Sequence, residues 1–249
     1  MTAPERAPLG AALALLLSLV SLTGALSPLL MALCVAALAL LIGVAWPDLL
    51  ELPSPAGTRV VIAGTGILGA LVGFIAPERI SPISAVVMVS AAGVFASFVH
   101  QMLRRDRRRL TASLTGTVAG VFISGIAACW VIAQSGAAET GATGQITAIT
   151  AGLCATLLLN CTPLPSVLRF VLSAAIGAAV TAALTLMLGG AVPLLAIGIG
   201  LVTAIGASCA HLLVGSSLVA KEPAPSLAVA AVPVATVGVV AHLVALLSA

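Results

Sequence analysis

The chain has few charged and few aromatic residues. Only 7% of its 249 residues are charged, against about 25% in a typical soluble domain. Aromatic residues make up 3%, and tyrosine is absent. A globular protein in water could not cover its surface with so few polar groups. The composition therefore argues against a soluble domain and indicates a protein whose solvent is the lipid bilayer. The net charge of +3 gives no sign of nucleic acid as a partner.

Residue patterns that carry catalysis are also missing. There is no GxxxxGK[ST] nucleotide loop, no HExxH zinc motif and no GxSxG nucleophile motif. Asp48 and Asp106 are the only aspartates, so a two-metal phosphoryl-transfer site is not expected. The five cysteines are scattered without a CxxC pair, and most lie in apolar runs, where cysteine acts as a small hydrophobe. We expect no metal and no cofactor, and an enzyme is the least favoured class.

Long apolar runs are what the sequence does contain. Runs such as Cys34–Trp46 (CVAALALLIGVAW) are continuous, which favours helices over the alternating strands of a membrane barrel. A spanning helix needs about 20 residues. Small, polar and glycine-rich Ser135–Gln145 is predicted to be a loop. The predicted helices are 9–26, 28–46, 60–76, 83–102, 111–134, 146–160, 167–188, 192–219 and 227–247. The predicted fold is an all-α polytopic transmembrane bundle of about nine spans, forming one integral membrane domain over residues 1–249 with no soluble domain.

Half of the ten cations lie in one short run between the fourth and fifth predicted helices. Cytoplasmic loops are enriched in lysine and arginine. Placing this run inside puts eight of the nine arginines and the N-terminus on the cytoplasmic side. Trp46 and Trp130 then fall near opposite interfaces, where we expect them to anchor the helices. The run consists of Arg104, Arg105, Arg107, Arg108 and Arg109.

Two interpretations of the arginine run stay open. It is an orientation signal that also attracts anionic lipid head groups at the cytoplasmic face, each arginine contributing about 1 kcal/mol near the surface. Alternatively it is a dedicated phosphate site, because the guanidinium fork matches phosphate oxygens, or it binds an acidic patch on a protein partner.

Three polar residues are candidates inside the membrane: His211, His242 and Gln134. Intramembrane polar groups are functional hypotheses by default. The two histidines fall at depths about 17 Å apart by helical rise, so they cannot share one metal or proton site. Each is either a neutral histidine hydrogen-bonded across helices or part of a proton relay or substrate site.

Glycine spacing predicts where helices approach closely. Gly69 and Gly73 form one GxxxG pair, and Gly116 and Gly120 form another. Small residues at this spacing let helix backbones pack together in lipid. Pro233 is expected to kink the last helix.

Three segments together resemble a group of uncharacterised multi-pass membrane proteins of actinobacteria: Trp46–Val61, Phe98–Gly120, and the last loop with its final helix. The resemblance implies a protein of the plasma (inner) membrane and implies no activity.

Two functional hypotheses from different classes follow. The first is a transporter or lipid-handling permease, with His211, His242 and Gln134 lining a cavity among small residues. The second is a non-catalytic subunit or scaffold of a cell-envelope assembly, with a protein partner or a second copy of the chain. A permease needs polar groups that face one internal cavity, whereas a scaffold can be packed solid.

Overall fold

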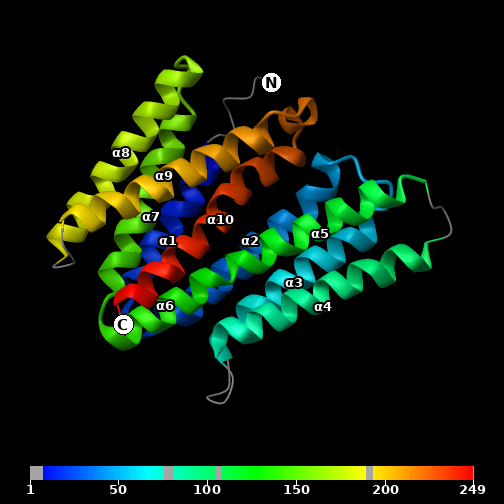
Figure 1. The fold of residues 1–249 in the computed structure, drawn as a ribbon, viewed down its shortest axis with the longest axis horizontal. Helices are drawn as coiled ribbons and strands as arrows, with labels where there is room; N and C mark the ends of the chain where they lie inside the picture. Colours follow the sequence, from blue (N-terminus) through cyan, green and yellow to red (C-terminus); the bar gives the residue numbers. More distant parts are fainter. Residues whose placement is uncertain (1–7, 76–80, 105–107, 189–192, 249) are drawn as a thin grey trace.

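The computed structural model describes residues 8–75, 81–104, 108–188 and 193–248. Within these ranges every regular element is a helix (Figure 1). The α-helices are α1 (Pro8–Ser21), α2 (Ser27–Leu49), α3 (Pro55–Ile75), α4 (Pro82–Leu103), α5 (Leu110–Ala127), α6 (Cys129–Thr140), α7 (Thr143–Asn160), α8 (Ser166–Met187), α9 (Pro193–Gly215) and α10 (Pro225–Ser248). Two short 3₁₀ turns, η2 (Gly24–Leu26) and η3 (Leu218–Lys221), precede α2 and α10.

The predicted all-helical membrane fold is confirmed. α5 and α6 follow one another as a single helical stretch, Leu110–Thr140, so each predicted helix has one counterpart. Among the described residues, seven helices are long and apolar enough to cross a membrane. The other two are α1, which has only 14 residues, and α7, which carries several polar residues along its 18. The chain is therefore a helical multi-pass membrane protein.

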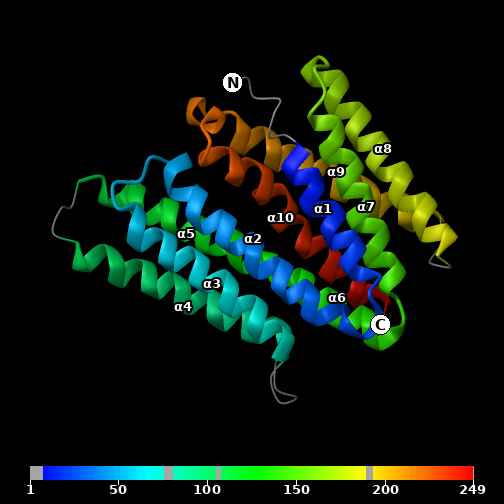
Figure 2. The same cartoon turned by 180° about the vertical axis from the view of Figure 1, so that it is seen from behind.

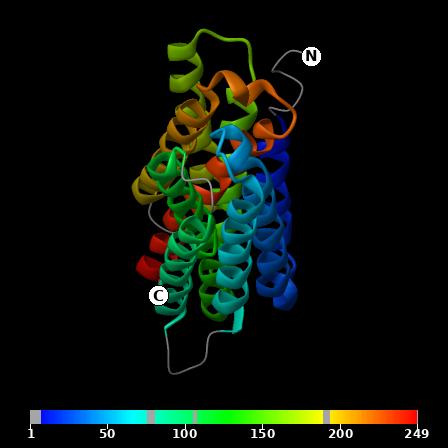
Figure 3. The same ribbon diagram turned by 90° about the vertical axis from the view of Figure 1, so that its right-hand side faces the viewer.

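The connections between helices gather at two ends of the bundle. At one end, which we call the arginine end, lie the α2–α3, α7–α8 and α9–α10 connections, the end of α4 and the start of α5. The α1–α2 and α6–α7 connections lie at the opposite end (Figures 1 and 3). α10 occupies the middle and packs against α1, α2, α5, α6, α7 and α9. α1 and α7 lie side by side (Figure 2). α4 and α8 lie at the periphery, each packed mainly on two neighbours.

The predicted loop Ser135–Gln145 is wrong, because most of it is helical. The helix continues to Thr140, whose hydroxyl donates to the Gly136 carbonyl. It ends at Gly141, which has φ of 75°. A left-handed glycine at this position is a common helix terminator, and the Ala142 N–H donates to the Ala137 carbonyl as this motif requires. The connection to α7 is therefore a tight turn.

Neither tryptophan faces lipid, as the predicted interfacial anchors would. The Trp130 side chain is fully buried, and its indole N–H donates to the Val234 carbonyl of α10 at 2.9 Å. Trp46 is also buried, and its indole N–H donates to the Gly116 carbonyl at 2.8 Å. Because a buried indole needs an acceptor, each tryptophan ties its own helix to a neighbouring backbone.

Small residues line the contacts of α8 with its neighbours. Its buried face consists of Ser173, Ala174, Gly177, Ala178, Thr181, Ala182 and Thr185. Its larger side chains, such as Val167 and Val171, face outward. Apolar side chains gain nothing by leaving lipid, so close backbone approach stabilises the helix contacts instead. A Cβ at Gly177 would lie 2.9 Å from Ala204 Cβ of α9.

We predict that Gly177→Leu destabilises the protein, because its side chain would push α8 away from both α7 and α9. Overpacking of this kind costs about 1–3 kcal/mol. Gly64→Leu on α3 is the matched control, since nothing lies within 4 Å of a Cβ at Gly64. Thermal unfolding in a mild detergent measures the difference. Equal unfolding midpoints for the two variants would contradict the α8 packing described here.

Candidate functional site

Arg104 is directed into the arginine end of the bundle. Its guanidinium donates to the Gln101 side-chain oxygen at 2.7 Å and to the Ser113 hydroxyl at 3.1 Å. Gln101 and Ser113 are fully buried and bonded to each other at 2.9 Å. Arg104 therefore joins the end of α4 to the start of α5, which is a structural task in addition to any contact with lipid.

Arg109 forms a second internal link at the same end. Its guanidinium donates to the Glu51 carbonyl at 3.3 Å. Arg109 and Glu51 are the two non-glycine residues with positive φ in the part of the chain that the structure describes, at 50° and 49°. This conformation is uncommon for L residues, and the hydrogen bond between Arg109 and Glu51 stabilises it at both positions. Arg108 is also described, whereas Arg105 and Arg107 lie outside the described residues.

An ion pair joins α2 and α3 beside this site. One nitrogen of the Arg59 guanidinium lies 2.8 and 2.9 Å from the two carboxylate oxygens of Asp48. Sequence reasoning treated Arg59 only as one more cytoplasmic cation and missed the pair. The available signal was one acidic and one basic residue on either side of a short loop.

We predict that the five arginines at 104, 105, 107, 108 and 109 together set the membrane orientation. Changing all five to Gln removes half of the chain's cations, and the positive-inside bias weakens accordingly. Reporters fused between Gly141 and Ala142 and at Lys221 should then report mixed or exchanged sides. A variant with five lysines is the control, because it keeps the charge and should keep the wild-type sides. Wild-type sidedness in the glutamine variant would refute the orientation role.

Gln134 belongs to a buried polar cluster at the opposite end. Its side-chain nitrogen donates to the Ser27 hydroxyl at 2.9 Å, while its oxygen has no hydrogen-bond partner. Ser21 lies beside it and shares a 2.6 Å hydrogen bond with Thr147. The cluster joins α1, α2, α6 and α7. Gln134 is fully buried and lines neither of the two pockets described below.

The structure places His211 and His242 far apart along the bundle. His211 lies one turn from the end of α9 at the arginine end, and its ring lies beside the Val229 backbone of α10. His242 lies towards the opposite end of α10, and its buried Nδ1 has no partner. Neither lies with Gln134, so these three residues do not form one site.

Both glycine pairs lie at helix contacts. Cβ atoms at Gly69 and Gly73 would lie 3.3 and 3.4 Å from side chains around the α5–α6 junction. A Cβ at Gly120 would lie 2.8 Å from Trp46 Cδ1, and one at Gly116 would lie 3.1 Å from leucines after α2. The larger side chain of alanine or leucine would therefore be crowded at these positions.

The candidate site that sequence reasoning missed is a groove between α9 and α10. Its volume is about 550 Å³ and its walls are apolar. The flanking side chains are largely exposed: Leu194 is 79% exposed, Val202 58% and Leu243 53%. The full lining is Leu194, Leu195, Gly198, Ile199, Val202, Val240, Leu243 and Val244. Because both helices can span a membrane, this groove opens towards lipid.

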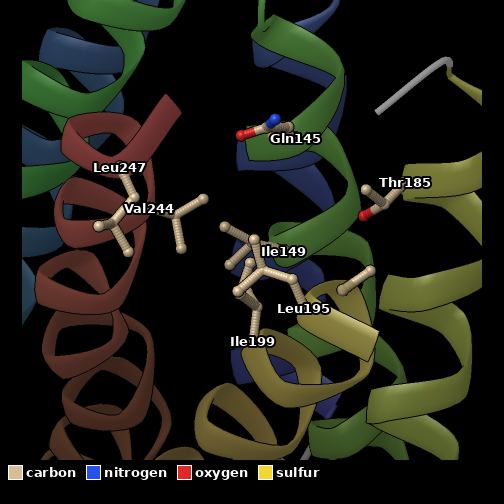
Figure 4. Close-up of a pocket in the computed structure, with 8 residues that line it drawn as sticks. Gln145, Ile149, Thr185, Leu195, Ile199, Val244 and Leu247 are labelled. Carbon is tan, nitrogen blue, oxygen red and sulfur yellow. The ribbon is translucent and has the colours of Figure 1, made fainter. Parts of the chain in front are cut away.

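The groove adjoins a small cavity inside the bundle. Figure 4 shows Ile149 of α7, Leu195 and Ile199 of α9, and Val244 of α10 around it. Its volume is about 20 Å³, and one water needs roughly 10–15 Å³. Gln145 and Thr185, from α7 and α8, are the polar side chains of its lining. The groove and the cavity share Leu195, Ile199 and Val244. Together they form a continuous path from the lipid-facing surface to the polar side chains Gln145 and Thr185. No sequence pattern marks this site, since it depends on how two uniformly apolar helices diverge.

Nothing in the described part of the chain has the composition of a metal centre, because no three His, Cys, Asp or Glu side chains come together there. All five cysteines are free. A scan against protein-family models, a search of curated proteins and a search of solved structures found no match to this chain.

Proposed function

We propose that the protein is a lipid-handling permease of the plasma membrane that takes a phospholipid acyl chain into the groove between α9 and α10. The groove supports this function because it is apolar, open to the side and large enough for part of a chain. Ligand pockets typically measure about 300–1,000 Å³, and the groove measures about 550 Å³.

The surroundings of the groove favour an acyl chain over a water-soluble substrate. Its mouth lies between two membrane-spanning helices, where the solvent is hydrocarbon. An uncharged, apolar lining offers a soluble substrate no hydrogen bonds and would desolvate its polar groups at a cost of several kcal/mol. A lipid chain suffers no such penalty.

The polar end of the adjoining cavity gives the bound lipid a direction. Gln145 lies in the first turn of α7 and Thr185 in the last turn of α8, both at the end opposite the arginines. We infer that the ester or head-group region lies at this end, with the acyl chain directed towards the bilayer centre along Ile199 and Val202.

The prediction that tests this function uses two glycines of α9. Gly198 lines the groove, Gly206 lies two turns away, and a Cβ at either meets open space. Gly198→Leu should fill the groove without disturbing the fold. It should lower photo-crosslinking of a diazirine-labelled phospholipid acyl chain at least about threefold, the effect of losing about one buried methylene contact. Gly206→Leu should label like wild type. Labelled peptides should map to 194–202 and 240–244.

The same pair of variants tests whether the protein moves phospholipid between leaflets as well as whether it binds phospholipid. In liposomes, transfer of a fluorescent phospholipid between leaflets should fall in Gly198→Leu and persist in Gly206→Leu. Labelling spread evenly over α4 and α8, or unchanged by Gly198→Leu, would contradict the proposal.

The second candidate function is a membrane subunit of a cell-envelope assembly. α4 favours it, because only 22% of its apolar window is buried and it exposes Phe95, Phe98 and Met102. Aromatic side chains and methionine are enriched at protein interfaces. A stoichiometric protein partner that crosslinks through α4, with no lipid transfer in the liposome assay, would establish this function in place of the first.

A further inference from the structure

Half-buried Arg169 has no counter-ion among the residues that the structure describes. It lies in the first turn of α8 at the arginine end. No hydrogen bond or ion pair joins its guanidinium to any residue that the structure describes, whereas Arg59, Arg104 and Arg109 are each bonded to protein atoms. A guanidinium carries five donors, so Arg169 can bind a ligand without first breaking a bond to the described part of the chain.

The ring of His211 faces the same region. A polar contact fixes the register of α8 against α9: the hydroxyls of Ser173 and Ser208 lie 3.1 Å apart. Arg169 lies one turn from Ser173, and His211 one turn from Ser208, both towards the arginine end. Arg169 and His211 are accordingly close enough to interact electrostatically.

Pro233 leaves an acceptor available beside the His211 ring. Proline has no N–H, so Pro233 leaves the Val229 carbonyl of α10 without its helical partner. The Val229 backbone lies beside the His211 ring, so this carbonyl can accept from one ring nitrogen and leave the other for a ligand.

The described part of the chain supplies Arg169 with no counter-ion. Burial raises the pKa of the neighbouring Cys161 thiol more than Arg169 lowers it, so the thiol is neutral at pH 7. Of the acidic residues that the structure describes, Asp48 is paired with Arg59, and none forms an ion pair with Arg169. The first-turn N–H groups of α8, uncapped by a side chain, add positive potential.

We infer that Arg169 and His211 form a binding site for a phosphate group at the arginine end of α8 and α9. A phosphate matches the arginine fork with two parallel hydrogen bonds and accepts a further bond from the histidine ring. Its source is either the phosphodiester of an anionic lipid or a free phosphate ion. The site lies at the opposite end of the bundle from the polar end of the groove, and it stands independently of the lipid-handling proposal.

The test measures thermal unfolding of the full chain in a neutral detergent while one of three additives is titrated: phosphatidylglycerol, phosphatidylcholine or inorganic phosphate. A ligand that binds only the folded state raises the unfolding midpoint in proportion to its occupancy. Phosphatidylglycerol should stabilise the wild type more than phosphatidylcholine does. Arg169→Gln should raise the half-effective concentration about tenfold, and Arg169→Lys should raise it less because lysine lacks the fork.

Lys221→Gln is the matched control, since it removes an exposed cation from the same end and should titrate like wild type. Without additive, Arg169→Gln should unfold at or above the wild-type midpoint, because it removes an unpaired charge; a merely structural arginine would lower it. Stabilisation by inorganic phosphate as well would identify a site for either source, and stabilisation by the lipid alone would identify the lipid. Identical titrations of wild type and Arg169→Gln would overturn the proposal.

Discussion

In hydrocarbon, a polar group must find its partner inside the protein, and the rest of this structure depends on that constraint. It explains why both indoles donate to backbone carbonyls of other helices. It also explains why the buried serines and threonines bond back to carbonyls three or four residues earlier, as Thr150 and Thr181 do. In the described part of the chain, few buried side chains keep a polar atom without a partner: Ser124, Gln134, Thr203 and His242.

The same constraint separates two regions of the bundle. Around α2, α6 and α10 the interior is filled by large side chains such as Trp130, Met31 and Ile42. There the side-chain nitrogen of Gln134 bonds α6 to Ser27 of α2. Around α8 and α9 the contacts are made by glycine, alanine, serine and threonine. α9 is drawn towards α8 by these small residues, while α10 is held by Trp130 on its other side. The groove lies where the two helices diverge, so the packing that holds the bundle together also opens it to lipid.

Much of the fold was predictable from sequence, because continuous apolar runs and prolines mark helices and breaks strongly. The α4–α5 break at the arginines and the α7–α8 break before Ser166 were predicted closely. The end of α6 was not, since Gly136 and Glu139 resemble loop residues, and only the geometry at Gly141 shows where the helix stops. The candidate sites were predicted poorly. In a chain this uniformly apolar, the sequence does not show which face of each helix points into the bundle. Gln134 was therefore expected to line a cavity, whereas it lies in a closely packed polar cluster. No sequence pattern indicated the groove.

The central claim is that this bundle binds lipid as a specific ligand and does not merely dissolve in it. Native mass spectrometry of the wild-type protein, extracted gently from its own membrane, tests that claim most directly. If lipid is a specific ligand, the protein ion should retain phospholipid in a fixed stoichiometry after the detergent is removed. A bare protein ion, or one that retains only a stoichiometric protein partner, would contradict it.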